Sequence, residues 1–127
     1  MRLTICLIAA LALVPAATPV GAKAAAKPAA FDINHTTWTF TEKGKAYRES
    51  IDESGNYVTH MGGKEVDHGS AVMKDGKACF TSAVDKEGEE CWTTRPVAVG
   101  HSMTTHNDKG RKLTVHRVAY VGMKTTK

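Results

Sequence analysis

The strongest constraint on the fold is an alternation of apolar and polar residues at every second position, which begins at Thr36. In the segment TTWTFTE, Trp38 and Phe40 fall on one side of an extended chain and the threonines fall on the other, as in a half-buried strand. Turn-forming residues interrupt the pattern at short intervals, and no segment has the period of an amphipathic helix. Short links favour antiparallel neighbours, because a parallel pair needs a long crossover.

The alternation predicts about eight short strands at a spacing of roughly ten residues. Their expected ranges are 36–42, 46–52, 57–61, 70–74, 77–83, 89–95, 101–106 and 111–121, with loops at 62–69 and 84–88. We therefore expect an all-β fold, an antiparallel up-and-down meander that forms a small barrel or a two-sheet sandwich. The core candidates are Trp38, Phe40, Tyr47, Ile51, Tyr57, Phe80, Trp92, Leu113, Val115, Ala119 and Val121.

Two charged residues conflict with this pattern. Glu49 and Arg117 lie between apolar residues of the same parity, so both are expected on the apolar face of their strands. Each side chain therefore needs a β-bulge, a mutual or other partner, or a wet interior.

The chain begins with the layout of a secretory signal peptide, which we place at residues 1–22. Arg2 precedes a twelve-residue apolar run, Leu3–Val14, which is too short to span a membrane as a helix. Small residues then precede an expected cleavage after Ala22. The 105 residues that follow are enough for a single domain. We expect a flexible spacer at 23–35, one β domain at 36–122 and a disordered tail at 123–127.

The charge of the chain is mild. Cleavage would remove one arginine and no acid, so the formal net charge would fall from +4 to +3. This value does not indicate a nucleic-acid partner. Residues 109–127 carry six basic residues and no acid, which we interpret as a solvated strand face and tail. A patch for acidic polymers or membrane surfaces is the alternative. No apolar run follows the leader, so no transmembrane segment is expected.

The mature chain would keep two cysteines, Cys79 and Cys91, each followed by an aromatic residue. In a hairpin, both sulfurs would lie on one sheet face and both aromatic rings on the other. A four-residue loop at 85–88 would leave the cysteines three positions out of register, so a disulfide requires a bulge or a differently placed turn. We predict a structural disulfide, since export implies oxidising conditions and closing this loop contributes on the order of 3 kcal/mol. A redox pair and a thiolate metal site are the alternatives.

Histidine and methionine side chains suggest a second kind of site. Thioether and imidazole together are typical ligands of copper. The candidate ligands are His60, His101, Met103 and His106. On a regular strand His101 and Met103 share a face and His106 points away, so the three converge only if the strand bends. Scattered surface histidines and core methionines explain the same composition, and in that interpretation no cofactor is expected.

Two short motifs carry less weight. GHSMT at 100–104 resembles the hydrolase turn that presents a nucleophilic serine, but Thr104 stands where the second glycine belongs. That turn also needs a large α/β fold, so we do not predict Ser102 as a nucleophile. The triplet NHT fits an N-glycosylation acceptor at Asn34, in a host that modifies such sites.

The chain resembles small exported proteins of alphaproteobacteria, especially sphingomonads. The resemblance covers residues 36–121 and rests on an aromatic first strand, the DGKACF and ECW segments, and a closing strand after the NDKG turn. It implies an exported β-rich protein and no particular activity, because the family is uncharacterised.

We therefore expect a periplasmic or secreted, monomeric protein that is not an enzyme and that binds a partner protein or a small molecule. Periplasmic binding of copper or another metal is the alternative.

Overall fold

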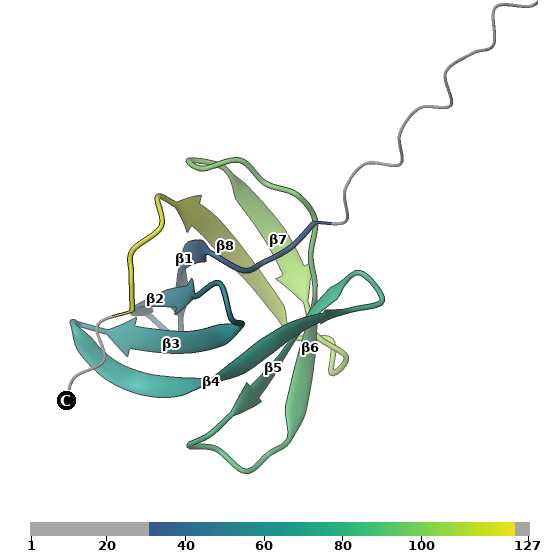
Figure 1. The fold of residues 1–127 in the computed structure, drawn as a ribbon, viewed down its shortest axis with the longest axis horizontal. Coiled ribbons are helices and arrows are strands. Elements are labelled where there is room, and N and C mark those ends of the chain that lie inside the picture. The colour runs from purple at the N-terminus through teal and green to yellow at the C-terminus, as the bar shows by residue number, and fades with distance from the viewer. Residues whose placement is uncertain (1–30, 124–127) are drawn as a thin grey trace, which may run out of the picture.

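The structure, a computed structural model, describes residues 31–123 of the 127-residue chain. These residues form strands and no helix, so the described chain has no helix that could cross a membrane. The prediction of an all-β fold is confirmed (Figure 1). The strands are β1 (Thr36–Glu42), β2 (Lys45–Ile51), β3 (Asn56–Met61), β4 (Lys64–Lys74), β5 (Lys77–Ser82), β6 (Glu89–Thr93), β7 (Ser102–His106) and β8 (Lys112–Val118). The predicted signal peptide, the spacer up to residue 30 and residues 124–127 lie outside the described residues.

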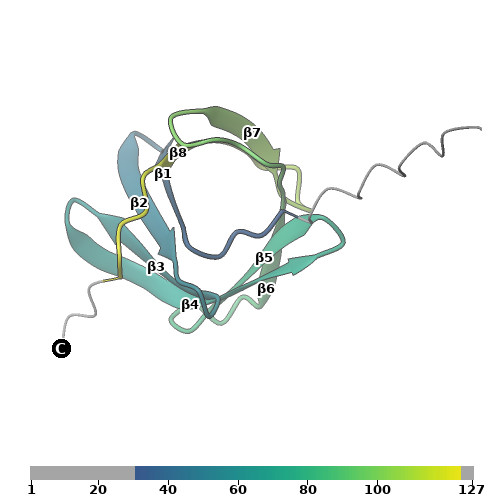
Figure 2. The ribbon, with the colours of Figure 1, turned by 45° about the horizontal axis from the view of Figure 1, so that its top comes forward.

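The eight strands form one antiparallel sheet in the order β6-β5-β4-β3-β2-β1-β8-β7. Since β1 pairs with both β2 and β8, the last strand returns to the first and the sheet curls into the ring seen in Figure 2. Strands β6 and β7 close the ring only partly, through a single bridge between Trp92 and Asn107. The fold is thus a nearly closed barrel rather than a sandwich, with a seam between β6 and β7.

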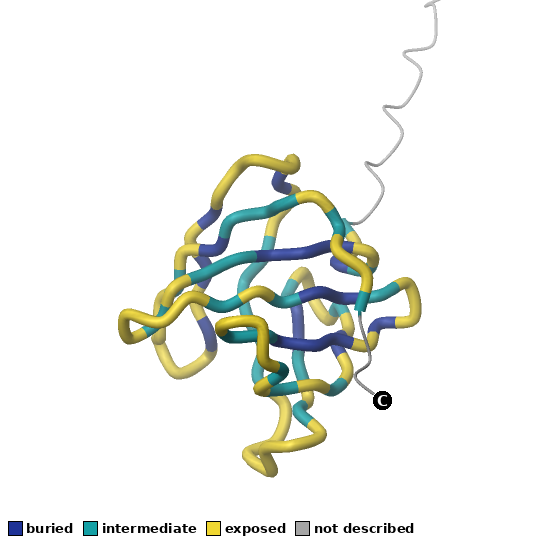
Figure 3. The backbone as a smooth tube through the Cα atoms, turned by 90° about the vertical axis from the view of Figure 1, so that its left-hand side faces the viewer, coloured by how far each residue is buried: buried dark blue, intermediate teal, exposed yellow. Residues whose placement is uncertain are grey.

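Strand alternation places one set of side chains inside this ring. Trp38, Ile51, Tyr57 and Val115 are buried as predicted, and the partly buried Phe40, Phe80 and Leu113 pack against them. The prediction is wrong for Ala119 and Val121, which are exposed because β8 ends at Val118. Figure 3 shows the buried positions along the middle of the strands and the exposed ones at the turns.

Strand β4 corrects the predicted loop at 62–69. Only Gly62 and Gly63 form the turn, and pairing with β3 resumes at Lys64, with a bulge where Thr59 and His60 meet β4. Gly69 is therefore a strand residue, not a turn residue. A Cβ atom at this position would lie 2.0 Å from the Thr81 carbonyl oxygen, so only glycine lets β4 and β5 pair here.

The segment before β1 belongs to the folded domain. Ile33 is 2% exposed and packs in the core, whereas residues 31–35 were predicted to be part of the spacer. His35 N–H donates to the Asp52 carbonyl oxygen and the Asn34 side chain donates to that of Glu53, which ties the segment to the β2–β3 turn. The correct boundary therefore lies ahead of Ile33, because this apolar side chain covers one end of the barrel.

The two cysteines lie directly opposite each other on β5 and β6. Their Cα atoms are 4.0 Å apart and their sulfurs are 2.10 Å apart, which is the distance of a disulfide bond. The register problem is solved by a longer loop, residues 83–88, in which Ser82 Oγ accepts hydrogen bonds from the backbone N–H groups of Val84 and Asp85. As predicted, the rings of Phe80 and Trp92 lie on the opposite face, inside the barrel.

The double variant Cys79→Ala/Cys91→Ala is expected to lose on the order of 3 kcal/mol of unfolding free energy, because its unfolded chain regains the freedom that the cross-link removes. Urea unfolding of the variant and of the unreduced protein measures this difference. A reductant should lower the midpoint of the unaltered protein and leave the variant unchanged. Equal midpoints for variant and parent would contradict the prediction.

Candidate functional site

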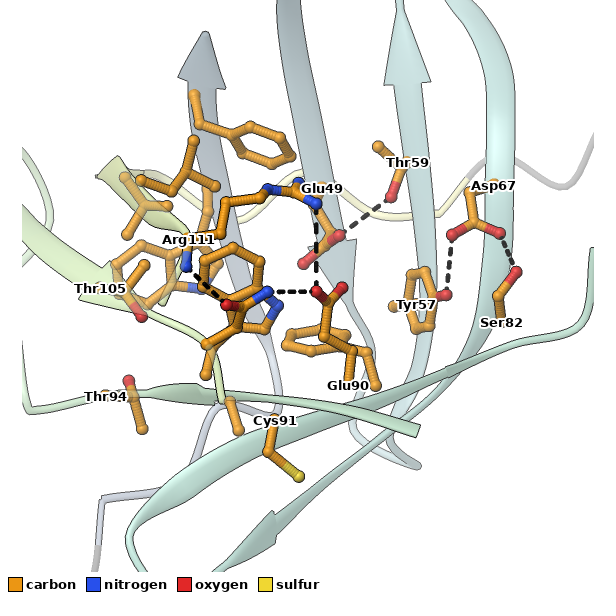
Figure 4. A pocket seen from close by; sticks show the side chains of 18 of the residues that line it. Glu49, Tyr57, Thr59, Asp67, Ser82, Glu90, Cys91, Thr94, Thr105 and Arg111 are labelled. Carbon is orange, nitrogen blue, oxygen red and sulfur yellow. Dashed lines mark hydrogen bonds and ion pairs between the residues drawn. The ribbon is translucent and has the colours of Figure 1, made fainter. Parts of the chain in front are cut away.

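The barrel encloses a cavity of about 360 Å³ (Figure 4). Six of the eight aromatic residues of the chain line it, including both tryptophans. Phe40 and Tyr47 stack with ring centroids 5.3 Å apart, and Tyr57 and Phe80 meet edge to face at 5.3 Å. These contacts hold the rings in fixed positions as an apolar wall.

Small side chains explain why the interior is hollow. The inward positions of an eight-stranded barrel just fill its interior when they are large, or leave room for one small ligand when they are not. Here Thr59, Ala78, Ser82 and Thr105 occupy inward positions on β3, β5 and β7. The volume that larger apolar residues would fill is left to the cavity.

Glu49 is the charged group deepest in this interior. It stands beside Trp38 on β1 and Thr59 on β3, and its Oε2 accepts a hydrogen bond of 3.0 Å from the Thr59 hydroxyl. Protein surrounds the carboxyl, but the group borders the cavity and is therefore not sealed from water. Burial raises the pKa of Glu49 to about 7; the Thr59 hydrogen bond opposes this shift and the charge of Asp67 adds to it.

Asp67 holds the neighbouring wall together. Its carboxylate accepts hydrogen bonds from the Tyr57 hydroxyl at 2.9 Å and from the Ser82 hydroxyl at 2.5 Å, so it links β3, β4 and β5 (Figure 4). Burial, reinforced by the hydrogen bond to Asp67, raises the pKa of Tyr57 well above its usual value. Tyr57 therefore stays neutral and serves as a hydrogen-bond donor at neutral pH.

Arg111 spans the rim of the cavity. Its guanidinium lies 2.6 Å from Glu42 Oε1 and 4.0 Å from Glu90 Oε1, and its Cζ atom is 5.3 Å from the centre of the Trp92 ring. The Asn107 side chain donates to the same Glu90 oxygen at 2.5 Å. These contacts join β1, β6 and the β7–β8 loop across the seam, where backbone pairing is sparse.

The lining is strongly acidic although the whole chain is basic. Of the 13 acidic residues, eight line the cavity or its rim, against two of the 17 lysines and arginines, Lys109 and Arg111. The eight acids are Glu42, Glu49, Asp67, Asp85, Glu87, Glu89, Glu90 and Asp108.

Arg117, the other charged residue predicted on an apolar face, does not line the cavity. Its guanidinium donates to the Val97 carbonyl oxygen at 2.7 Å and lies 6.0 Å from the Trp38 ring centre, while its buried Nε has no hydrogen-bond partner within the described chain. Glu49 and Arg117 both flank Trp38 but form no ion pair in the part of the chain that the structure covers. Each has a separate partner.

The proposed copper ligands are not brought together. Met103 is buried in the core, whereas His101 and His106 are exposed at the two ends of β7. His60 borders an open groove on the outer face, on β3, which the sheet order separates from β7 by β2, β1 and β8. In residues 31–123, the one group of three such ligand types within 4.8 Å is Cys79, Glu89 and Cys91, and both of its sulfurs are bonded to each other.

Ser102 lies on the outer face, where its hydroxyl and the Nδ1 atom of His116 are 2.7 Å apart. Both side chains belong to the surface of the sheet and neither reaches the cavity. The structure thus gives this serine an exposed hydrogen bond and no place in the aromatic interior.

Sequence reasoning found part of the cavity lining. The parity of Glu49 marked it as an inward charge, and the aromatic residues were identified as interior. Asp67 was missed because its segment was assigned to a loop, and Glu90 and Arg111 were missed because their contacts cross the seam. The sequence did contain one indication of a polar cavity wall, because several strands carry polar residues at inward positions.

Comparison with known proteins gives no match: no family model, no curated protein and no solved structure matches this chain.

The raised pKa of Glu49 predicts a pH-dependent stability. The unfolded chain releases this proton near its ordinary pKa of 4.5 and the folded chain near 7, so the folded state binds more protons between these values. Folding stability from this group is present at low pH and is lost as pH rises through that window. Glu49→Gln should match the parent at about pH 4 and exceed it by on the order of 2–3 kcal/mol at about pH 8.

Urea unfolding at both pH values measures this difference. Glu53→Gln is the matched control, since the Glu53 side chain is 85% exposed, and it should change stability equally little at either pH. A Glu49→Gln variant that differs from its parent by the same amount at both pH values would show that the carboxyl titrates normally.

Proposed function

We propose that this protein binds one small, largely apolar molecule inside its barrel, and that it does so after export to an oxidising compartment. The observation that carries the proposal is the cavity of about 360 Å³ with aromatic walls. Its volume falls within the usual range of small-molecule sites, roughly 300–1,000 Å³, and such sites combine apolar walls with a few convergent polar groups. The hydroxyls and carboxyls of Thr59, Glu49 and Asp67 supply those groups here.

Binding is favoured over catalysis by the chemistry of the lining. None of the described lining residues is a histidine, and Cys91, the one cysteine among them, is bonded to Cys79. The hydroxyls of Tyr57 and Ser82 are engaged by Asp67, which fixes them as structural groups. A site of this kind recognises a molecule by shape and hydrogen bonding.

Export is supported by the predicted leader and by the pairing of the two cysteines. A cross-strand disulfide persists in oxidising compartments and is rare in the cytosol. A periplasmic or extracellular location fits a small domain that gains stability from such a bond.

Binding of the neutral dye N-phenyl-1-naphthylamine tests the proposal, because its fluorescence rises in apolar surroundings. We expect saturable binding of one dye molecule per chain. Ala78→Leu, which adds volume at an inward position that is 4% exposed, should weaken binding by about tenfold or more. The matched control Ala46→Leu makes the same change at an exposed position of β2 and should bind like the parent.

Melting temperatures show whether each variant is folded. Dye binding that is unsaturable, or that Ala46→Leu weakens as much as Ala78→Leu, would place the dye outside the cavity and overturn the proposal.

A further inference from the structure

The distribution of charge narrows the chemical class of the ligand. The cavity and its rim carry eight acidic side chains and two basic ones, in a chain whose formal net charge is +4. The groove on the outer face shows the opposite composition: the described residues that line it include Arg48, Lys112 and two histidines, and no acid. Negative charge thus gathers at the cavity and its rim, and the low-dielectric walls strengthen the effect of the inward carboxyls on a bound charge.

Half of these acids are matched by cations of the protein. Arg111 lies against Glu42 and Glu90, and two lysines that flank the β4–β5 turn each contact one further acid at the rim. Those two pairs are Lys74 with Glu89 and Lys77 with Asp108. The two inward carboxyls differ, because within residues 31–123 their side-chain partners are neutral hydroxyls: that of Thr59 for Glu49, and those of Tyr57 and Ser82 for Asp67. A carboxylate at this depth is stabilised by an opposite charge, which a ligand can supply.

The aromatic walls suit the same charge. A cation over the face of an aromatic ring is attracted by the negative face of the π-system, and tryptophan is the most favourable ring. Trp38 stands directly beside Glu49 in the β1–β2 register, and Trp92 already holds the guanidinium of Arg111 at 5.3 Å. Rings and a carboxylate together form the kind of cage that recognises alkylated ammonium groups.

We propose that the ligand of this cavity is a small organic cation, an apolar or aromatic molecule that carries a quaternary or protonated amine, and that its positive charge is held by Glu49 and the surrounding rings. This inference rests on the proposed function. A carboxylate or phosphate ligand is disfavoured, because inside the barrel it would meet Glu49 and Asp67, whereas the two basic lining residues, Lys109 and Arg111, both come from the β7–β8 loop.

Binding of such a cation depends on pH, because Glu49 must be ionised to attract it. The affinity should therefore begin to fall as the pH drops through the pKa of Glu49, about 7. Other ionisable groups also line the cavity and its rim. They are Glu42 on β1, Tyr47 on β2, Tyr57 on β3, Asp67 on β4, Asp85 and Glu87 in the β5–β6 loop, Glu89 and Glu90 on β6, and Asp108, Lys109 and Arg111 in the β7–β8 loop. Below about pH 7, affinity for a permanent cation should fall by up to about tenfold per pH unit.

Two probes of equal shape test the charge directly. Benzyltrimethylammonium carries a permanent positive charge, and neopentylbenzene replaces its nitrogen by carbon. Quenching of Trp38 and Trp92, which both line the cavity, reports the binding of either probe. At pH 8.5 the cation should bind about tenfold or more tightly than the isostere, and its affinity should fall towards pH 5.5 while that of the isostere stays constant.

Glu49→Gln should lower the affinity for the cation at pH 8.5 by about tenfold and abolish its pH dependence, with the isostere unaffected. Glu53→Gln is the control at an exposed position and should behave like the parent. If Glu49→Gln fails to fold, the pH dependence of the two probes' affinities for the unaltered protein is sufficient to test the inference. Equal or tighter binding of the isostere at pH 8.5, or a pH dependence retained in Glu49→Gln, overturns the inference.

The two proposals fail in different ways. Binding of neopentylbenzene and of the naphthylamine dye without preference for the cation would leave a binding protein with another ligand class. Failure of the dye and of both probes to bind would remove the binding function itself.

Discussion

The pairing of β1 with β8 determines the rest of the structure. A meander of eight strands is by itself an open sheet with two faces, and neither face is distinguished from the other. When β8 pairs with β1 over Val115–Val118, the sheet becomes a ring. Alternate residues of every strand then point either into the barrel or out of it. The aromatic walls, the inward carboxyls and the position of the disulfide on the face opposite Phe80 and Trp92 all follow from that one ladder, since each side chain keeps the face that its strand position assigns.

The cavity combines two features that are unfavourable when taken separately. An empty apolar space loses packing contacts, and a carboxyl away from water loses hydration. In this barrel the cavity lets solvent or a ligand reach the Glu49 carboxyl. The carboxyl in turn supplies the cavity with a polar group that a ligand can contact. Natural cores usually avoid both features, and their joint presence at one point of the barrel is what supports the binding function proposed above.

The alternation in TTWTFTE was sufficient to place β1 at its observed bounds, and similar patterns located most other strands. The first half of β4 was not predictable in this way: its inward Asp67 contacts polar groups at the cavity wall, so its alternation is not apolar against polar. The register of Cys79 and Cys91 depends on the length of the loop between β5 and β6. The positions of glycine and aspartate in the sequence did not determine that length. The cavity could not be predicted for a related reason. Its volume depends on which small side chains face each other across the barrel, and no local sequence pattern shows that the barrel closes.

The seam between β6 and β7 has a consequence for solubility. Two strands that face each other with one bridge leave backbone groups that, in an open sheet, would recruit a strand from another chain and begin aggregation. Here the Thr105 hydroxyl donates to the Thr93 carbonyl oxygen, and the His106 N–H donates to the Thr93 hydroxyl. These side chains take the place of the missing ladder, so the edges of β6 and β7 are poor templates for a strand of another copy.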